Sequence, residues 1–416
     1  MKGRIIIRKK LGVCLILIFL LTNIHAVTLY AFEDNETRIK QLDHFLKNDA
    51  RLNGVLASLS VRSATTGELI YNYNGDMLLR PASNLKLLTV AAALSTLGED
   101  YSFHTEIFTD GKLKWKILNG HLYIKGKGDP TLLKSDIDRI VKDLKQKGIK
   151  MIRGDLVGDD QWYDNVRYSI DLPWSDETMG YGAQISALTF APKKHRDPGT
   201  VFVKVHPGTS VGKKAIVTVE PHTERIKVIN ETKTVTDKKQ NTLNVYREHG
   251  TNTIFIIGEI PLHAEVIENS LAVWEPTDYT LHLFKQSLKL SLDTNQLFLR
   301  DGSGISHVNL ISANQISKLL YEVQGQEWFP IFFDSLPVAG AEDELEGGTL
   351  RYRMKGASTF RNVHAKTGTL TTVSSISGYT KTKAGETLIF SIILNNLFDD
   401  YSGKSIEDQM VTILAK

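Results

Sequence analysis

Two short motifs near opposite ends of the chain constrain its fold more than any other feature. The first is Ser83 followed three residues later by Lys86, at the start of an Ala/Leu-rich run that ends at Gly98. The run predicts a buried helix with Ser83 as its N-cap and Gly98 as its C-terminal stop. Residues three apart share a helix face, so the Ser83 hydroxyl and the Lys86 amine can meet. A desolvated lysine can have its pKa lowered enough to take the serine proton.

The second motif is Lys366-Thr367-Gly368, which lies in a segment with the pattern of a strand. Strand-like segments over 363–370, 373–381 and 387–395 predict an antiparallel meander, with a turn over 382–386. S-x-x-K alone is frequent by chance and also fits an ordinary helix start with a snorkelling lysine. Followed far downstream by K-T-G, it is the signature of serine acyl transferases. The pair therefore predicts a serine nucleophile, with the lysine and threonine of the strand facing a substrate carboxylate.

The N-terminus has the pattern of an export signal. Basic residues precede an apolar stretch over 11–21, and small residues follow at Ala26 and Ala31. We therefore expect a signal peptide over 1–31, cleaved after either alanine. A permanent N-terminal anchor is the alternative, although the apolar stretch is short for a membrane span. The chain would then touch the membrane only through this segment.

Composition excludes several classes of function. The only cysteine, Cys14, lies in the signal segment, so the mature chain has no thiol for a nucleophile, a metal site or a disulfide. Removing 1–31 leaves 45 basic and 47 acidic residues, and no basic patch indicates nucleic acid. The histidines show no metal-ligand spacing, so neither a metal nor another cofactor is expected. The length predicts two or three domains.

The segments around the two motifs predict one discontinuous catalytic domain. A helix is expected over 36–48, and strands over 56–62 and 69–73 form a hairpin that leads to Ser83. We expect this hairpin to join the K-T-G sheet, so that the first and last thirds of the chain close an α+β domain with an antiparallel sheet. After the signal peptide, the catalytic domain is expected to span 32–102 and 269–416, with a nested insert over 103–268 between these two segments.

The insert is expected to be mostly β and to form one or two subdomains. Its only clear helix spans 134–148, with Ser135 as the expected cap. Residues 208–212 match the G-x-S-x-G elbow of α/β-hydrolases around Ser210, but that elbow needs a strand before it and a helix after it. Strands flank this one on both sides, which favours a hairpin turn. The strand-like segments are 103–109, 113–117, 121–125, 152–157, 201–205, 215–219, 226–229, 243–247 and 253–258.

With these motifs in order, the chain resembles the exported D-alanyl-D-alanine carboxypeptidases, low-molecular-mass penicillin-binding proteins of the three-domain type, and above all their Bacillus-type members. The resemblance implies a penicillin-binding/serine β-lactamase-like catalytic domain and covers nearly all of the mature chain. Beyond S-x-x-K and K-T-G, it rests on Lys125-Gly126-Lys127-Gly128-Asp129-Pro130, Gly158-Asp159-Asp160, Glu248-His249-Gly250-Thr251-Asn252, Asp301-Gly302-Ser303-Gly304, Leu336-Pro337-Val338-Ala339-Gly340 and Gly347-Gly348-Thr349-Leu350-Arg351.

The resemblance also implies roles for individual residues. Ser83 would attack the carbonyl of the penultimate D-alanine of a peptidoglycan stem peptide, with Lys86 as its base. The backbone N–H groups of Ser83 and Thr369 would form the oxyanion hole. Lys366 and Thr367, next to Gly368, would hold the terminal carboxylate. Water would release the peptide from the acyl-enzyme, and β-lactams would inhibit at the same serine.

One departure from the family pattern concerns its third motif, S-x-N, on an all-helical lobe. A helix predicted over 281–289 runs almost directly into 297–301, so the lobe is shortened near 289–297 and the motif is missing. The only literal match, Ser312-Ala313-Asn314, starts a helix beyond the expected place. Gln315 favours a capping role for Ser312 instead.

A second departure concerns the acid expected to receive the ammonium of the stem peptide's diamino acid. Relatives carry an acidic pair where this chain reads Asp164-Asn165. Asp164 is the remaining candidate for that substrate contact. Trp162 could line the same pocket, although an aromatic residue in a β insert is more often part of the core.

Two functions are therefore expected from the sequence. The first is a serine-type D-alanyl-D-alanine carboxypeptidase, with endopeptidase action on cross-links left open, working outside the cytoplasm at the cell wall or membrane. The second is a catalytically impaired paralogue that binds peptidoglycan stems or β-lactams without turnover, which the missing S-x-N motif favours. A third interpretation, an α/β-hydrolase acting through Ser210, fails on its structural context.

Overall fold

The computed structural model describes residues 36–169, 171–194, 196–288 and 310–416. The predicted signal peptide over 1–31, the shortened lobe near 289–297 and the Asp301–Gly304 motif lie outside the described residues. Among the described helices, none combines the length and the apolar character that crossing a membrane requires. The chain forms two compact units, Met1–Glu99 with Asn309–Lys416 and Asp100–Val308, and each is described by itself.

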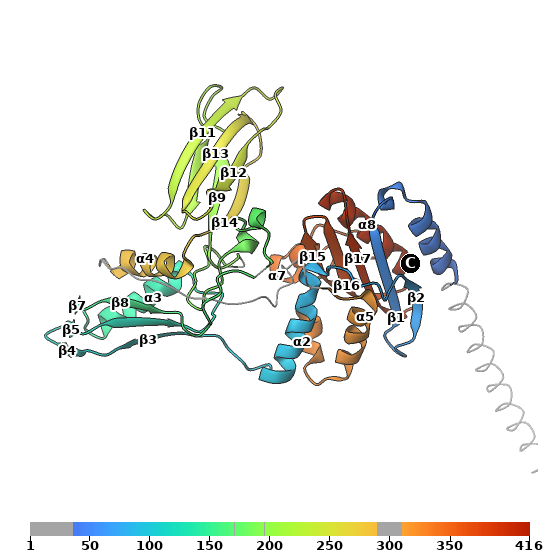
Figure 1. The fold of residues 1–416 in the computed structure, drawn as a ribbon, viewed down its shortest axis with the longest axis horizontal. Helices are drawn as coiled ribbons and strands as arrows, with labels where there is room; N and C mark the ends of the chain where they lie inside the picture. The colour runs from blue at the N-terminus through green and yellow to red at the C-terminus, as the bar shows by residue number, and fades with distance from the viewer. Residues whose placement is uncertain (1–35, 170, 195, 289–309) are drawn as a thin grey trace, which may run out of the picture. The chain divides into compact units, whose positions relative to one another are not determined.

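The first unit is built on a five-stranded antiparallel sheet in the order β15-β16-β17-β1-β2 (Figure 1). The predicted meander is confirmed residue for residue, and the predicted hairpin joins the sheet through pairing of β1 with β17. The expected α+β class with an antiparallel sheet is therefore confirmed. The strands are β1 (Leu56–Ser63), β2 (Leu69–Tyr73), β15 (Val363–Leu370), β16 (Val373–Lys381) and β17 (Thr387–Asn395).

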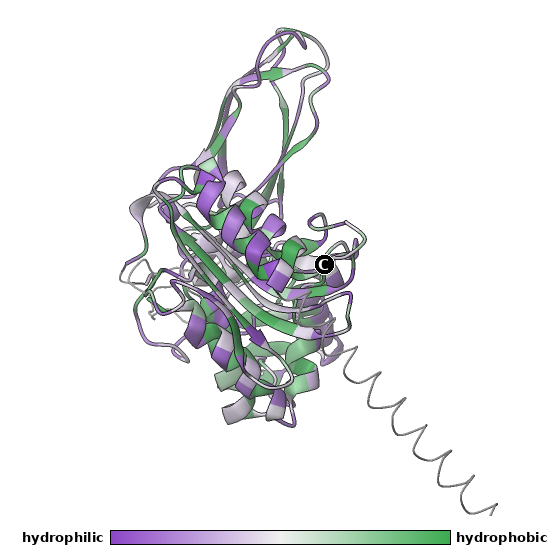
Figure 2. Ribbon diagram, turned by 90° about the vertical axis from the view of Figure 1, so that its right-hand side faces the viewer, coloured by the Kyte–Doolittle hydropathy of each residue, from purple (hydrophilic) through white to green (hydrophobic). Residues whose placement is uncertain are grey.

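Helices cover both faces of this sheet, which explains why β16 and β17 are buried along almost their whole length. The predicted helix over 36–48 and α8 (Asp400–Leu414) bury residues such as Leu42 and Met410 against one face. On the other face lie α2 (Leu85–Leu97), α5 (Ala313–Glu322) and α6 (Phe329–Asp334). Figure 2 shows hydrophobic residues, in green, along the strands between these layers. Short helices α7 (Glu344–Gly347) and η6 (Gly348–Leu350) precede β15.

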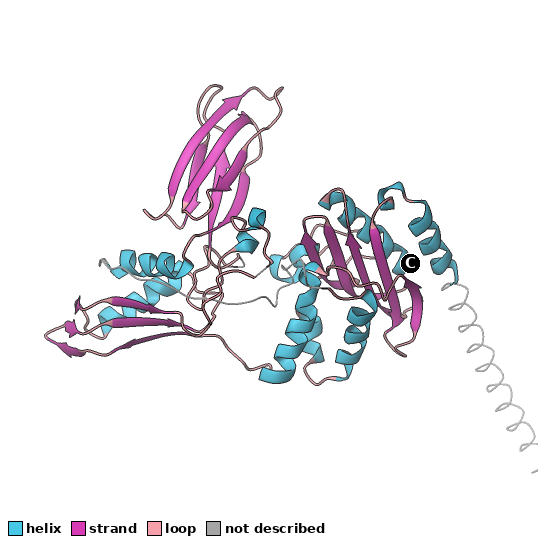
Figure 3. Ribbon diagram, viewed as in Figure 1, coloured by secondary structure: helices cyan, strands magenta, loops and turns pink. Residues whose placement is uncertain are grey.

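The second unit is mostly strand, as Figure 3 shows in magenta, with two longer helices, α3 (Lys134–Gln146) and α4 (Pro276–Leu288). Its internal contacts extend this unit beyond residue 268, where the insert was expected to end. The last strand, β14, pairs with β9, and α4 buries Tyr279 and Phe284 in the core of this unit. Its strands are β3 (Thr105–Thr109), β4 (Lys112–Lys114), β5 (Ile117–Asn119), β6 (Leu122–Gly126), β7 (Met151–Arg153), β8 (Leu156–Asp159), β9 (Thr200–His206), β10 (Ile216–Glu220), β11 (Lys227–Val235), β12 (Asn244–Arg247), β13 (Thr253–Pro261) and β14 (Ile267–Ala272).

Two local predictions in this unit have different outcomes. Ser135 does not cap α3, because the helix begins one residue earlier, at Lys134. The Asp136 carboxylate accepts the Leu133 N–H at 3.0 Å and closes the N-terminal turn instead. The G-x-S-x-G segment around Ser210 is confirmed as a turn between the paired antiparallel strands β9 and β10.

A buried ion pair ties α8 to the chain before β15. Glu407 is fully buried, and its carboxylate accepts hydrogen bonds from Arg353 at 2.7 Å and from Ser374 Oγ at 2.5 Å. Burial raises the pKa of Glu407, whereas the Arg353 guanidinium acts to lower it. Removing one partner of such a pair is far more costly than removing both, because an uncompensated charge stays behind.

We predict that Arg353→Met lowers the free energy of unfolding by about 3–5 kcal/mol at neutral pH. The deficit should shrink as the pH is lowered toward 5, because a protonated Glu407 needs no cation. Urea unfolding curves measure both effects. The double variant Arg353→Met/Glu407→Gln, which removes both charges, should be more stable than the single one; equal or lower stability would contradict the pairing.

Candidate active site

Ser83 lies in a tight turn that precedes α2. Residues Ala82–Asn84 form the single 3-10 turn η2, and Ala82 is fully buried in a left-handed conformation with φ 46°. Such a conformation is unusual for a residue with a side chain and persists only where the surrounding packing holds it. The Ser83 hydroxyl accepts a hydrogen bond from Lys86 Nζ at 3.0 Å. The structure therefore brings the predicted nucleophile and base together.

The predicted capping role of Ser83 is wrong. The helix proper begins at Leu85, and no side chain caps its N-terminus, because the Ser83 oxygen is directed at Lys86. The C-terminal prediction is confirmed: Gly98 follows the last helical residue with φ 81°, and its N–H donates to Leu94 O at 3.1 Å. Freed from capping, the Ser83 oxygen stays beside the amine that can deprotonate it.

The K-T-G strand lies directly against the Ser83 turn. A Cβ atom added at Gly368 would stand 2.8 Å from Ser83 N and 2.9 Å from Pro81 O, and closer still to Ser375 Oγ. Only glycine permits this approach of two backbones. The Ser375 hydroxyl on β16 donates to Pro81 O at 2.6 Å and holds the turn from the neighbouring strand. Ser83 thus packs on β15, which is an edge strand of the sheet.

Lys366 adds a second amine to the site. Its Nζ donates to Thr367 O at 2.5 Å. Burial, and after it the positive charge of Lys86, lowers the pKa of Lys366 to about 8. At neutral pH most molecules therefore keep the Lys366 charge, but they hold it in a site that solvates it poorly. An anion that enters beside Ser83 would relieve both the desolvation and the repulsion between the two lysines.

Thr367 and Thr369 lie on either side of Gly368. The Thr367 hydroxyl, on a buried residue, is 2.7 Å from the Thr349 hydroxyl in η6, which fixes its orientation. Thr369 is exposed at the end of β15. Three polar residues of the site were not predicted as functional from the sequence: Thr349, Ser375 and Asn84, the last of which is fully buried beside Ser83. Of these three residues, Thr349 could have been identified from the sequence, because it lies within the G-G-T-L-R motif shared with the family.

Asp164 belongs to the second unit. Its carboxylate is exposed and accepts the Val166 N–H at 3.1 Å, so some of its hydrogen-bonding capacity stays open to a ligand. The core interpretation of Trp162 is wrong, because this residue is 51% exposed and Lys127 Nζ lies 5.1 Å above its ring.

The literal S-x-N match is a helix cap, as predicted. Ser312 Oγ accepts the Gln315 N–H at 3.2 Å, and Gln315 Oε1 accepts the Ser312 N–H at 2.9 Å. This reciprocal pair is a capping box that starts α5. Asn314 is engaged with Asp76 at 2.6 Å. The Ser312 side chain is thus used in the helix cap, and the Asn314 amide nitrogen in a bond to a residue distant in sequence.

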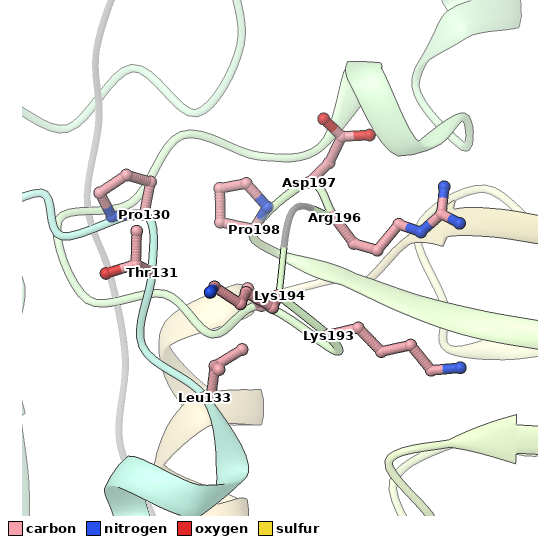
Figure 4. A pocket seen from close by; sticks show the side chains of 9 residues that line it. Pro130, Thr131, Leu133, Lys193, Lys194, Arg196, Asp197 and Pro198 are labelled. Carbon is pink, nitrogen blue, oxygen red and sulfur yellow. The ribbon is translucent and has the colours of Figure 1, made fainter. Parts of the chain in front are cut away.

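The second unit contains a cavity of about 490 Å³ (Figure 4). Figure 4 shows that apolar, basic and acidic side chains share the lining, among them Pro130, Pro198 and Leu133, then Lys193, Lys194 and Arg196, and finally Asp197. Among the described residues that line it, the only hydroxyl group is that of Thr131, and there is neither a serine nor a cysteine. Across the described residues of the chain, no three histidine, aspartate or glutamate side chains gather as a metal site would require.

Comparison with known proteins identifies relatives along the whole described chain. The family model for "D-Ala-D-Ala carboxypeptidase 3 (S13) family" matches residues 38–292 and 289–416. The D-alanyl-D-alanine carboxypeptidase of Actinomadura sp. (strain R39) is 31% identical over 459 residues, 91% of this chain and 85% of the relative. Carboxypeptidase Rv3627c of Mycobacterium tuberculosis is 25% identical over 85% of this chain and 79% of its own length.

Solved structures show the same fold. Penicillin binding protein 4 (DacB) from Haemophilus influenzae matches with a TM-score of 0.72 at 20% identity, over 90% of this chain and 99% of that one. The same protein complexed with a β-lactam matches with a TM-score of 0.66 over the same shares of both chains. The penicillin-binding fold expected from the sequence is therefore confirmed.

We predict a pKa near 8 for Lys366, measured by NMR titration of the protein labelled with ¹³C at lysine side chains. In Lys86→Met the pKa of Lys366 should rise, because a like charge has been removed, while staying below its usual 10.5 because burial persists. An unchanged or lower value in this variant would contradict the proximity of the two amines. Lys381→Met, which changes an exposed lysine on the neighbouring strand β16, is the matched control and should leave the value unchanged.

Proposed function

The chain belongs to the D-Ala-D-Ala carboxypeptidase 3 (S13) family of serine hydrolases, and on that premise we propose that it removes the terminal D-alanine from peptidoglycan stem peptides through an acyl-enzyme at Ser83. The observation that carries the proposal is the hydrogen bond between Ser83 Oγ and Lys86 Nζ, beside the K-T-G strand. A serine becomes nucleophilic when an adjacent base takes its proton, and here one amine is in place.

The chemical steps follow from this arrangement. Unprotonated Lys86 accepts the hydroxyl proton while Ser83 Oγ bonds to the carbonyl carbon of the penultimate D-alanine. The C–N bond then breaks, the proton passes to the leaving amine, and D-alanine departs. Water next attacks the ester carbonyl, and hydrolysis frees Ser83 and the shortened peptide. A β-lactam would also acylate Ser83 Oγ, as its ring C–N bond breaks and the freed amine takes the proton while staying attached to the acyl group. Penicillin binding protein 4 from Haemophilus influenzae has been solved with a β-lactam.

The oxyanion of each tetrahedral intermediate needs two N–H donors, which we assign to Ser83 and Thr369. Alternate residues of an antiparallel strand direct their N–H groups to opposite edges. The Ala365 N–H donates to Pro337 O, away from β16. The N–H of Thr369, four residues on, is therefore expected to point away from β16 as well, toward the edge where the Ser83 turn lies.

The terminal carboxylate of the substrate is assigned to Lys366 and Thr367. A charged Lys366 attracts an anion in a poorly solvated site more strongly than it would in water. Because its pKa is about 8, the grip on the carboxylate should weaken as the pH rises through that value. Asp164, with its exposed carboxylate, remains the proposed partner for the ammonium of the diamino acid side chain.

We further propose that the protein acts outside the cytoplasm. Peptidoglycan lies there, and the predicted signal peptide over 1–31 would direct the chain across the membrane. The same acyl-enzyme would also serve endopeptidase action on cross-links, in which the leaving amine belongs to a second stem peptide and not to free D-alanine.

The second candidate function is binding of stem peptides or β-lactams without turnover. The family model matches in two segments that overlap at 289–292, where the sequence predicts a shortened lobe without the S-x-N motif. By resemblance, that serine and asparagine would contact the Lys86 amine and the substrate amide. Losing such proton-relay and positioning groups can lower a rate by about 10²–10⁴-fold.

One experiment separates the two functions. Purified protein, Ser83→Ala and Ser210→Ala are incubated with fluorescent penicillin and, separately, with a peptide ending in D-Ala-D-Ala. We expect labelling and D-alanine release from the natural protein and from Ser210→Ala, the matched serine control, and neither from Ser83→Ala. Labelling without release would favour the binding function. Labelling that survives in Ser83→Ala would exclude Ser83 as the nucleophile, and a folded protein that is never labelled would overturn the proposal.

We also predict that Gly368→Ala lowers the rate of penicillin acylation by at least ~10²-fold, because the new methyl group must push the Ser83 turn away from β15. Gly385→Ala, in an open turn where an added Cβ meets nothing within 4 Å, tests the cost of a glycine change far from Ser83. Stopped-flow labelling compares the two. A normal acylation rate in Gly368→Ala would show that the close approach is not needed for the chemistry.

A further inference from the structure

Asn84 connects the nucleophile turn to the K-T-G strand. It follows Ser83 directly and is 0% exposed, with its side-chain amide directed at β15 and β16. The orientation that satisfies both ends of the amide has its nitrogen donating to Lys366 O at 2.7 Å and its oxygen accepting from Ser377 Oγ at 2.8 Å. The buried Asn84 side chain thus connects the turn that carries the nucleophile to the backbone of Lys366, the lysine assigned to the substrate carboxylate.

The hydrogen bond from Asn84 to Lys366 O connects the turn to a part of β15 that the Ser375 and Gly368 contacts do not reach. The Ser375 hydroxyl holds Pro81 O, and Gly368 lets the strand approach Ser83 N, so both act before or at the nucleophile. Asn84 alone among these reaches the peptide that joins Lys366 to Thr367. Its hydrogen bond therefore sets the distance between the attacking oxygen and the groups that would grip the carboxylate.

Asn84 also lies at one end of a row of buried hydroxyl groups in the middle of the sheet. Ser377 on β16 is in register with Ser391 on β17, 2.9 Å away between hydroxyls, and Ser391 is in register with Ser60 on β1. All three serines are fully buried, and Ser60 Oγ lies 2.8 Å from Ser317 Oγ on α5. Buried polar groups weaken a core unless each is hydrogen-bonded. The row satisfies Asn84 without offering it a flexible or solvent partner.

We propose that Asn84 is a positioning residue. It holds the backbone of Lys366 and Thr367, the two residues assigned to the substrate carboxylate, in register with the Ser83 nucleophile. The inference rests on the proposed function, since it deepens the assignment of that site. Reacting groups displaced by about 1 Å can lose about 10²-fold in rate. Asn84 touches neither the substrate nor the reacting atoms, so it acts only through Lys366.

The test compares Asn84→Ala with Ser317→Ala. Ser317, on α5, is equally buried and is hydrogen-bonded to Ser60 and Arg62 of β1 in the same sheet, so it matches the structural cost of deleting a buried polar group. Each variant is assayed for thermal unfolding and for acylation by two peptides, one ending in a free carboxylate and one in a carboxamide. Asn84→Ala should lower acylation by the carboxylate peptide about 10²-fold and by the carboxamide peptide much less. Ser317→Ala should change both rates equally and by less than about threefold.

Equal losses with both peptides in Asn84→Ala would overturn the proposal, because a general defect does not distinguish the carboxylate. Ser377→Ala provides a second variant that removes the other partner of the amide. It should reproduce some of the loss of discrimination, and the double variant should be no worse than Asn84→Ala alone. Additive losses would contradict a shared route through Asn84.

A readout independent of activity separates this inference from the proposed function. The pKa of Lys366 is titrated by NMR in natural protein, Asn84→Ala and Ser317→Ala. Loss of the backbone hydrogen bond should let water reach Lys366 and raise its pKa in Asn84→Ala only. If the natural protein is never acylated but the pKa of Lys366 still rises in Asn84→Ala, the proposed function fails and the positioning role stands. An unshifted pKa in Asn84→Ala would overturn the positioning role whatever the activity.

Discussion

The approach of the Gly368 backbone to the Ser83 turn is the contact on which the site depends. A residue with a side chain at 368 would collide with Ser83 N and Pro81 O, so the nucleophile and the K-T-G strand meet only through glycine. The left-handed Ala82 places the turn at this edge, and the Ser375 hydroxyl keeps it there. The geometry of the site is thus carried by backbone atoms, which hold positions more rigidly than long side chains do.

The sheet explains how residues from the two ends of the chain come to share this site. Pairing of β1 with β17 joins the N-terminal hairpin to the C-terminal meander, and the second unit leaves the first between Glu99 and Asn309. The nucleophile turn and the strand it faces therefore belong to the same compact unit. The contacts of this turn with Lys86, Gly368 and Ser375 all lie within that unit.

The electrostatics of the site favour an anionic ligand. Two amines, those of Lys86 and Lys366, lie near one serine, and burial of Lys366 makes its charge costly to keep. The Lys366 amine donates to Thr367 O, the Thr349 hydroxyl contacts the Thr367 hydroxyl, and the Asn84 amide contacts Lys366 O. A carboxylate entering there would complete a partly satisfied network and would need little reorganisation of the protein.

Local pattern was enough to predict much of this protein. The helix over 36–48, the three strands of the meander and the capping box at Ser312 follow the sequence closely, because alternation, helical period and turn residues act over a few neighbours. The motif pair and the family were also readable there. What only the tertiary structure decided was the use of each polar group. Ser83 faces Lys86 and does not cap its helix. Nothing in the local sequence distinguishes Asn84 from other polar residues, because its burial and its hydrogen-bond partners come from β15 and β16. Hydrogen-bond partners so distant in sequence are chosen by packing, and packing has no local signal.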